Sequence, residues 1–95
     1  MDHQVMHNPT QQMFFIEYEG AKALLSYSIR DGGIIDFTNT YVPPELRGGT
    51  LAARLAEAGL SYAVERGYRI AASCSYIRHY IATHPRYHQY LAVSL

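Results

Sequence analysis

Tryptophan is absent from this chain of 95 residues, and cysteine and lysine occur once each, as Cys74 and Lys22. A single cysteine excludes an internal disulfide bond, so we expect a reducing, cytoplasmic setting. The first residues lack the basic and apolar regions of a signal peptide, and no apolar run is long enough to span a membrane. We therefore expect no membrane partner.

Charged residues of either sign are also scarce, and the 8 basic and 8 acidic residues give a formal net charge of zero. Domains that bind nucleic acid carry a basic stripe, so this balance argues against nucleic acid as a partner. Apart from Lys22 the basic residues are all arginine. Arginine suits bidentate recognition of phosphate or carboxylate, although ordinary surface arginine explains the bias equally well. The nine tyrosines fit either a tyrosine-lined cleft or satisfied core and surface aromatics.

The amino-terminal half of the chain has the pattern of a strand meander. Residues 1–11 are polar and without periodicity, and we expect them to form a flexible tail before a domain at 12–95. Strands are predicted at 13–18, 23–30 and 34–42, with Asp31-Gly32-Gly33 as a hairpin turn. Three strands in such short succession indicate antiparallel pairing.

The remaining elements are a long helix, a fourth strand and a second helix. Apolar residues recur at helical spacing over 51–66, and Gly67 follows as a helix C-terminal glycine. A strand at 68–74 comes after this crossover helix, which indicates parallel pairing with the third strand. A second helix is predicted from Tyr76 to about Thr83. The fold class is therefore α+β, with a mixed antiparallel and parallel sheet in the order β-β-β-α-β-α.

The most informative segment joins the third strand to the long helix. It reads Pro43-Pro44-Glu45-Leu46-Arg47-Gly48-Gly49-Thr50 and runs directly into the helix. The prolines end the strand, and the glycines leave backbone N–H groups accessible at the positive end of the helix dipole. A turn of this kind binds phosphate groups.

This chain resembles the GNAT superfamily of acyl-CoA-dependent N-acetyltransferases, and in particular a small single-domain branch of it. The superfamily's pyrophosphate motif, [Q/R]-x-x-G-x-[G/A], falls on Arg47–Ala52, with Thr50 in place of the central glycine. Three further marks of the branch occur in order: Tyr41–Gly48, Ser73–Tyr76, and His84-Pro85-x-Tyr87. The resemblance covers roughly residues 12–91.

The resemblance implies transfer of an acetyl group from acetyl-CoA, as co-substrate, to an amine acceptor, without a metal. It implies that the pyrophosphate of coenzyme A lies on the N–H groups of residues 48–52. It places pantetheine beside the end of the third strand, where the fourth strand splays away and opens a wedge near Cys74. The expected acetyl-CoA-binding residues are Thr40, Tyr41, Val42, Arg47, Gly48, Gly49, Thr50, Leu51 and Ala52. The hydroxyl of Thr50 either donates to phosphate, crowds it, or simply caps the helix.

Four residues are candidates for the chemistry at this wedge. Cys74 precedes a helix, whose start favours the thiolate form, so it could accept the acetyl group or relay a proton; a buried structural cysteine is the alternative. Tyr76 and Tyr80 lie one helical turn apart and could protonate the departing thiolate, or serve only in packing. Asn39 stands where the branch often has histidine, and it could orient a water or the acyl carbonyl but not act as a base.

Two other functions remain open at this point. The chain could be a non-catalytic module that binds coenzyme A, since Asn39 replaces a residue able to take a proton. It could also be a protein-interaction domain with a relic pocket. His79 and His84 are weaker candidate bases, and we expect a monomer or a weak homodimer.

Overall fold

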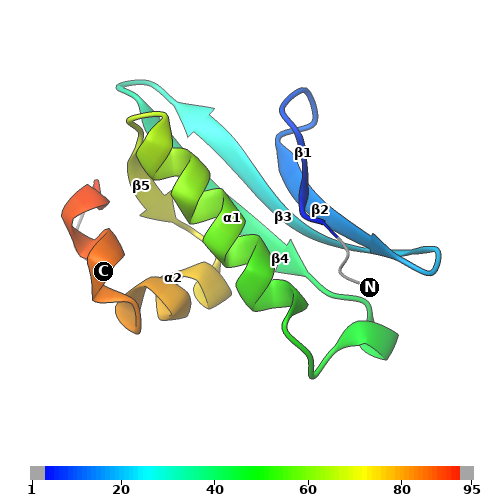
Figure 1. Ribbon diagram of the computed structural model, residues 1–95. Helices are drawn as coiled ribbons and strands as arrows, with labels where there is room; N and C mark the ends of the chain where they lie inside the picture. The colour runs from blue at the N-terminus through cyan, green and yellow to red at the C-terminus, as the bar shows by residue number, and fades with distance from the viewer. Residues whose placement is uncertain (1–3, 93–95) are drawn as a thin grey trace.

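The structure, a computed structural model, describes residues 4–92 and consists of one sheet with two helices (Figure 1). The strands are β1 (Met6–Asn8), β2 (Met13–Tyr18), β3 (Ala21–Arg30), β4 (Ile34–Tyr41) and β5 (Arg69–Ala72). The helices are α1 (Leu51–Glu65) and α2 (Ser75–Ala82), and short 3₁₀ helices occupy Pro44–Leu46 and Pro85–Tyr90.

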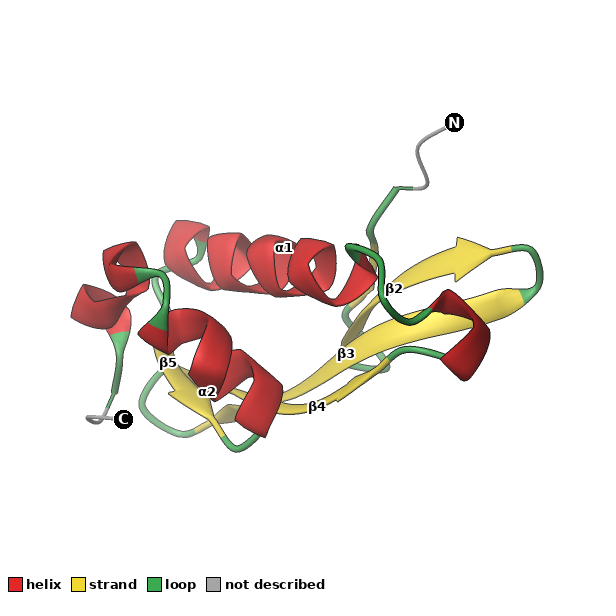
Figure 2. Cartoon of the chain, turned by 90° about the horizontal axis from the view of Figure 1, so that it is seen from below, coloured by secondary structure: helices red, strands yellow, loops and turns green. Residues whose placement is uncertain are grey.

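The five strands lie in the order of the sequence, β1-β2-β3-β4-β5. The pairs from β1 to β4 are antiparallel, and β5 runs parallel to β4 after the crossover through α1. This arrangement confirms the α+β class and the mixed sheet. The carboxyl end of β5 leads into α2, which packs against β4, β5 and α1 beside the sheet (Figure 2).

The expectation of a flexible tail at residues 1–11 is wrong for Met6–Asn8, which form the edge strand β1 on β2. The strand is held by His7, whose ring stacks on Phe14 at 4.2 Å and whose Nε2 lies 2.6 Å from the hydroxyl of Tyr27. A three-residue polar strand has no hydrophobic period, so only its tertiary contacts reveal it. Residues 1–3 and 93–95 of the expected tail and domain lie outside the described part of the chain.

The core lies between the sheet and α1. Leu55, Leu60 and Ala63 of α1 are fully buried against the inward side chains of the strands, as the helical spacing predicts. At Gly59, α1 lies close against the sheet, because a Cβ there would be 2.8 Å from Leu25 Cδ2 and 2.9 Å from Phe37 Cε1. The glycine therefore sets the depth at which α1 packs.

The boundaries of the second half differ slightly from the predicted ones. Strand β5 is shorter than 68–74, since regular pairing ends at Ala72, and α2 begins at Ser75 with Cys74 as its N-cap. Gly67 has a φ of 76° and ends α1 as predicted.

Candidate functional site

The segment between β4 and α1 forms a small hollow at the start of the helix. Its volume is about 130 Å³. Its lining residues are Val42, Leu46, Arg47, Gly48, Gly49, Leu51 and Ala52. Apart from Leu46, each of these residues was expected from the sequence to bind acetyl-CoA. The turn therefore brings six of the nine expected acetyl-CoA-binding residues together around one hollow.

The two glycines keep this hollow open. Gly48 has a φ of 88°, which L side chains rarely adopt, and a Cβ at Gly48 or Gly49 would meet nothing within 4 Å. The first N–H groups of α1 have no partner within the helix. The turn therefore offers backbone donors and the positive end of the helix dipole at a place that a phosphate can approach.

Thr50 and Arg47 shape the turn in different ways. Thr50 is the N-cap residue and its carbonyl accepts from the N–H of Arg54 at 2.9 Å, but its hydroxyl makes no capping hydrogen bond. Its position as N-cap is thus confirmed, while capping by its side chain does not occur. Arg47 folds back: its Nε donates to the carbonyl of Val42 at 2.7 Å and its guanidinium lies over the ring of Tyr41 at 5.9 Å.

Strands β4 and β5 separate within the part of the sheet nearest this turn. Their last paired residues are Phe37 and Ala72, and one more contact joins the N–H of Cys74 to the carbonyl of Phe37 at 2.9 Å. Beyond this contact β4 continues to Tyr41, whereas the segment after β5 turns into α2 (Figure 2). We call the space between the two strands beyond Phe37 and Ala72 the wedge.

A β-bulge in β4 decides which side chains reach the wedge. The register with β3 passes from Tyr27↔Phe37 to Ser26↔Asn39, so Thr38 is the extra residue. After the bulge Thr40 lies opposite the buried Leu25 and faces the core side of the sheet. Asn39 lies opposite Ser26, is exposed, and faces the other side. The structure therefore does not place Asn39 on the same face as Thr40, and its role in catalysis stays a prediction.

Cys74 meets Thr40 inside the wedge. Its Sγ is 3.3 Å from the hydroxyl oxygen of Thr40, and the residue is only 8% exposed. Its own carbonyl accepts from the N–H of Arg78 at 3.0 Å, which ties it to the first turn of α2. A thiol and a hydroxyl in this geometry can share a proton, and either atom can be the donor.

Tyr76 and Tyr80 follow Cys74 along α2, with ring centroids 6.3 Å apart. Burial, with the electrostatic interaction with Cys74 as a smaller cause, raises the pKa of Tyr76 above its ordinary 10.0. Burial also raises the pKa of Tyr80, and the nearby Glu57 carboxylate adds to the effect. Both phenols are therefore protonated at neutral pH and available as proton donors.

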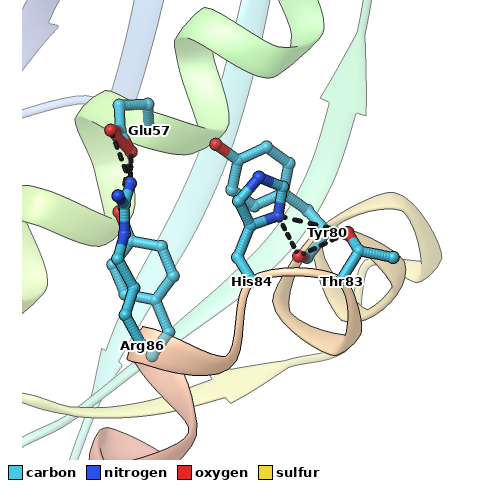
Figure 3. A network of polar contacts seen from close by, with 6 residues as sticks. Glu57, Tyr80, Thr83, His84 and Arg86 are labelled. Atoms are coloured by element: carbon cyan, nitrogen blue, oxygen red, sulfur yellow. Dashed lines mark hydrogen bonds and ion pairs between the residues drawn. The ribbon is translucent and has the colours of Figure 1, made fainter.

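The His84-Pro85-x-Tyr87 motif has a structural place in this arrangement. The His84 ring stacks on Tyr80 at 3.8 Å, and its Nδ1 lies 2.7 Å from the Tyr80 carbonyl (Figure 3). The hydroxyl of Tyr87 donates to Glu57 at 2.7 Å, and Arg86 forms an ion pair with the same carboxylate. These contacts connect the last 3₁₀ helix to α2 and α1 and hold the Tyr80 ring in place.

Two charged residues that support the site were not found from the sequence. Glu57 lies on α1, and its carboxylate accepts the Tyr87 hydroxyl. Asp36 is 3% exposed and binds Ser73, the residue before Cys74. A charged residue inside the apolar run Ile34-Ile35-Asp36-Phe37 is the signal that marks the latter position.

Within residues 4–92, no three histidine, cysteine or acidic side chains lie close enough together to hold a metal ion. In the same range, neither α1 nor α2 combines the length and apolar character that a membrane crossing requires.

A profile of the GCN5-related N-acetyl-transferase family matches residues 13–91. The chain belongs to this family. Protein NATD1 of Gallus gallus is 33% identical over 84 residues, covering 86% of this chain and 76% of that protein. Protein NATD1 of Homo sapiens is 32% identical over 83 residues, covering 85% and 74%.

The GCN5-related N-acetyltransferase fold is also confirmed by a solved structure. The NMR structure of a GCN5-like protein from Staphylococcus aureus superposes with a TM-score of 0.74 at 28% identity, covering 97% of this chain and 89% of that one. Members of the GCN5-related family generally use acetyl-CoA.

Proposed function

We propose that this protein transfers an acetyl group from acetyl-CoA to an amine. The observation that carries the proposal is the placement of two features at the end of β4: the glycine-walled hollow at α1 and the Thr40–Cys74 contact in the wedge. One suits a pyrophosphate and the other a thioester, which are the two chemically distinctive parts of acetyl-CoA. Bound acetyl-CoA supplies an activated acetyl group.

The residues of the hollow bind and orient the co-substrate. Gly48, Gly49 and the first turn of α1 line the hollow, and their backbone N–H groups are the donors for phosphate oxygens in this proposal. Thr40 and Tyr41 lie in β4 where it has lost β5 as a partner, so their backbone edge suits the amide groups of pantetheine. Val42 follows them at the hollow, with its carbonyl held by Arg47.

The side chains around Cys74 hold the protons that the reaction moves. Cys74 either takes the acetyl group onto Sγ or relays a proton through the hydroxyl of Thr40. Tyr76 and Tyr80 hold protons at their Oη atoms and serve as acids for a departing sulfur. Asn39 is exposed on the other face of the sheet from Thr40, and a role of its amide in orienting a water or the acyl carbonyl stays a prediction.

The proposal includes the setting of the reaction. We place the protein in the cytoplasm, as a monomer or weak homodimer without nucleic-acid or membrane partners. The support is the formal net charge of zero and the single cysteine.

Mass spectrometry with acetyl-CoA tests the function directly. The wild-type protein, Cys74→Ala and the control Lys22→Gln, which lies on β3 away from the wedge, are each incubated with acetyl-CoA and measured under native and then denaturing conditions. We expect a native adduct of acetyl-CoA with all three proteins, and loss of transfer to a test amine of at least about 100-fold in Cys74→Ala.

The outcomes separate the alternatives. An acetyl group that survives denaturation and is absent from Cys74→Ala indicates covalent chemistry at Sγ, and transfer without such an adduct indicates direct transfer. Binding without turnover to any amine reduces the function to a coenzyme A-binding module. A folded wild-type protein that binds no acetyl-CoA contradicts the proposal and favours an interaction domain.

A further inference from the structure

The hydrogen-bond register between β4 and β5 shifts by one residue where their regular pairing ends and the wedge begins. The N–H of Arg69 donates to the carbonyl of Gly33 at 2.9 Å. In a parallel pair every second residue of a strand donates its N–H to the neighbouring strand. Continuing from Arg69 along β5, this regular pattern would pair the N–H of residue 73 with the carbonyl of Phe37. Instead, that carbonyl accepts from Cys74 at 2.9 Å, and the N–H of Ser73 donates to Oδ1 of Asp36 at 2.9 Å.

A side-chain carboxylate thus occupies the place of a backbone acceptor. Asp36 is 3% exposed, and its neighbours Ile35 and Phe37 point into the core, so its side chain lies on the sheet face away from α1. Its Oδ2 accepts the hydroxyl of Ser73 at 2.8 Å and forms an ion pair with Arg30. Both oxygens of the carboxylate are therefore satisfied, two of the three contacts being to Ser73.

The carboxylate is charged under ordinary conditions. Burial opposes its ionisation, but the backbone and hydroxyl donors of Ser73, together with Arg30, outweigh burial and hold the pKa of Asp36 below its ordinary value. A charged acceptor binds an N–H more strongly than a neutral carbonyl does. This difference explains why Ser73 leaves the ladder for Asp36.

The geometry points to Asp36 as the positioning residue that opens the wedge and presents Cys74 to Thr40. Because Ser73 donates to Asp36, the regular β4–β5 pairing ends at Ala72, and the last backbone hydrogen bond between the two segments is made by the N–H of Cys74. The Thr38 bulge loosens β4 at the same level from the β3 side, so the two strands part where Thr40 and Cys74 meet. This inference rests on the proposed function only in taking the wedge as the acetyl-CoA site.

Asp36 acts through Ser73 rather than by touching the reacting atoms, and its effect can be separated from a general loss of stability. A merely structural ion pair would alter the unfolding free energy and leave the register unchanged. The inference requires that the register itself changes when the acceptor is lost, so that Phe37 takes the N–H of Ser73 and the wedge narrows.

The register is measured in protein without ligand by NMR scalar couplings across hydrogen bonds. In the wild type we expect the carbonyl carbon of Phe37 to couple to the amide nitrogen of Cys74. In Asp36→Ala it should couple to that of Ser73. Asp36→Val is measured beside it, because a β-branched residue favours the strand, fills the space left by the carboxylate and offers no acceptor.

Conservative variants and a matched control complete the test. Asp36→Asn keeps one acceptor oxygen but loses the charge, so we expect its couplings of Phe37 to Ser73 and to Cys74 to lie between those of the wild type and of Asp36→Ala. Arg30→Gln removes the ion pair but leaves both Ser73 contacts, and Arg30 is half exposed, so we expect the wild-type register and an acetyl-CoA affinity within about threefold of the wild type. In Asp36→Ala and Asp36→Val, we expect kcat to fall by about tenfold or more, because Cys74 is misplaced.

The two proposals fail separately. If the couplings of folded Asp36→Val match the wild type, the inference about Asp36 is overturned, whatever the enzyme does. Equal kcat and acetyl-CoA affinity in wild type and Asp36→Val would overturn it as well. If the register shifts as expected but wild-type protein binds no acetyl-CoA, the role of Asp36 in setting the strands stands and the proposed function is contradicted.

Discussion

Thr40 and Cys74 lie 34 positions apart in the sequence, yet the hydroxyl of one is 3.3 Å from the thiol of the other. Two irregularities produce this contact. The bulge at Thr38 turns Thr40 toward the core side, and the capture of Ser73 by Asp36 brings Cys74 to the end of the β4–β5 ladder. The contact joins the strand expected to hold pantetheine to the helix that carries the two tyrosines.

Removing the Thr40 hydroxyl should therefore reduce catalysis without unfolding the domain. Thr40→Val keeps the shape of the side chain and removes its hydrogen bond, and we expect kcat to fall by up to about tenfold, since a typical hydrogen bond contributes about 0.5–1.5 kcal/mol. Thr40→Ser retains the hydroxyl and should stay within a few fold of the wild type. Steady-state kinetics of acetyl transfer measure both, and equal activity of the valine variant would exclude a role for the hydroxyl.

Replacing Thr50 by glycine restores the residue expected at the centre of the pyrophosphate motif. The Thr50 hydroxyl makes no capping bond, and a Thr-to-Gly change at an N-cap costs only a few tenths of a kcal/mol. We expect the affinity for acetyl-CoA, measured by calorimetry, to stay within about threefold of the wild type. A large gain in affinity would show that the Thr50 side chain obstructs the phosphate.

Gly59→Ala should destabilise the protein although alanine is the better helix former. The intrinsic gain is about 1 kcal/mol, but the new Cβ would lie under 3.0 Å from both Leu25 and Phe37, and overpacking costs about 1–3 kcal/mol or more. Urea unfolding should show a lower free energy of unfolding. In a Leu25→Val background, where the Cδ2 atom is gone, the loss should be smaller; equal losses in the two backgrounds would mean that this contact does not set the helix depth.

His7 should make stability depend on pH just below neutrality. Burial, with the nearby charge of Arg66, lowers the pKa of His7 below its ordinary 6.5. The unfolded chain therefore binds the proton more readily, so the stability is complete above 6.5, falls as the pH drops toward the folded-state pKa, and levels off below it. Urea unfolding across this range measures the slope.

Two variants identify the residue responsible for that slope. His7→Phe preserves a flat ring against Phe14 and should remove this component of the slope, even if the lost bond to Tyr27 lowers stability at every pH. Tyr27→Phe leaves the imidazole buried and should keep the slope. An unchanged slope in His7→Phe would assign the pH dependence to another group.

Much of the fold could be predicted because its signals are local. The alternating apolar residues of 23–30, the glycine pair at 32–33 and the helical spacing of 51–66 each fix an element through short-range sterics and burial. Strand β1 could not be predicted in this way, because its three residues are ordered by the rings of Phe14 and Tyr27 from other strands.

Residue types at fixed spacing were enough to predict the element order after β1, the glycine turn at α1 and the family. Which side chains meet in the wedge depends instead on how the strands pack. A strand's strict two-residue alternation places Phe37 and Asn39 on one face, but the bulge at Thr38 moves Asn39 to the other face and brings Thr40 to Cys74. Likewise the N–H of Ser73 binds the Asp36 carboxylate, 37 positions away in the sequence, rather than the backbone carbonyl of Phe37, because a buried charged oxygen is the stronger acceptor.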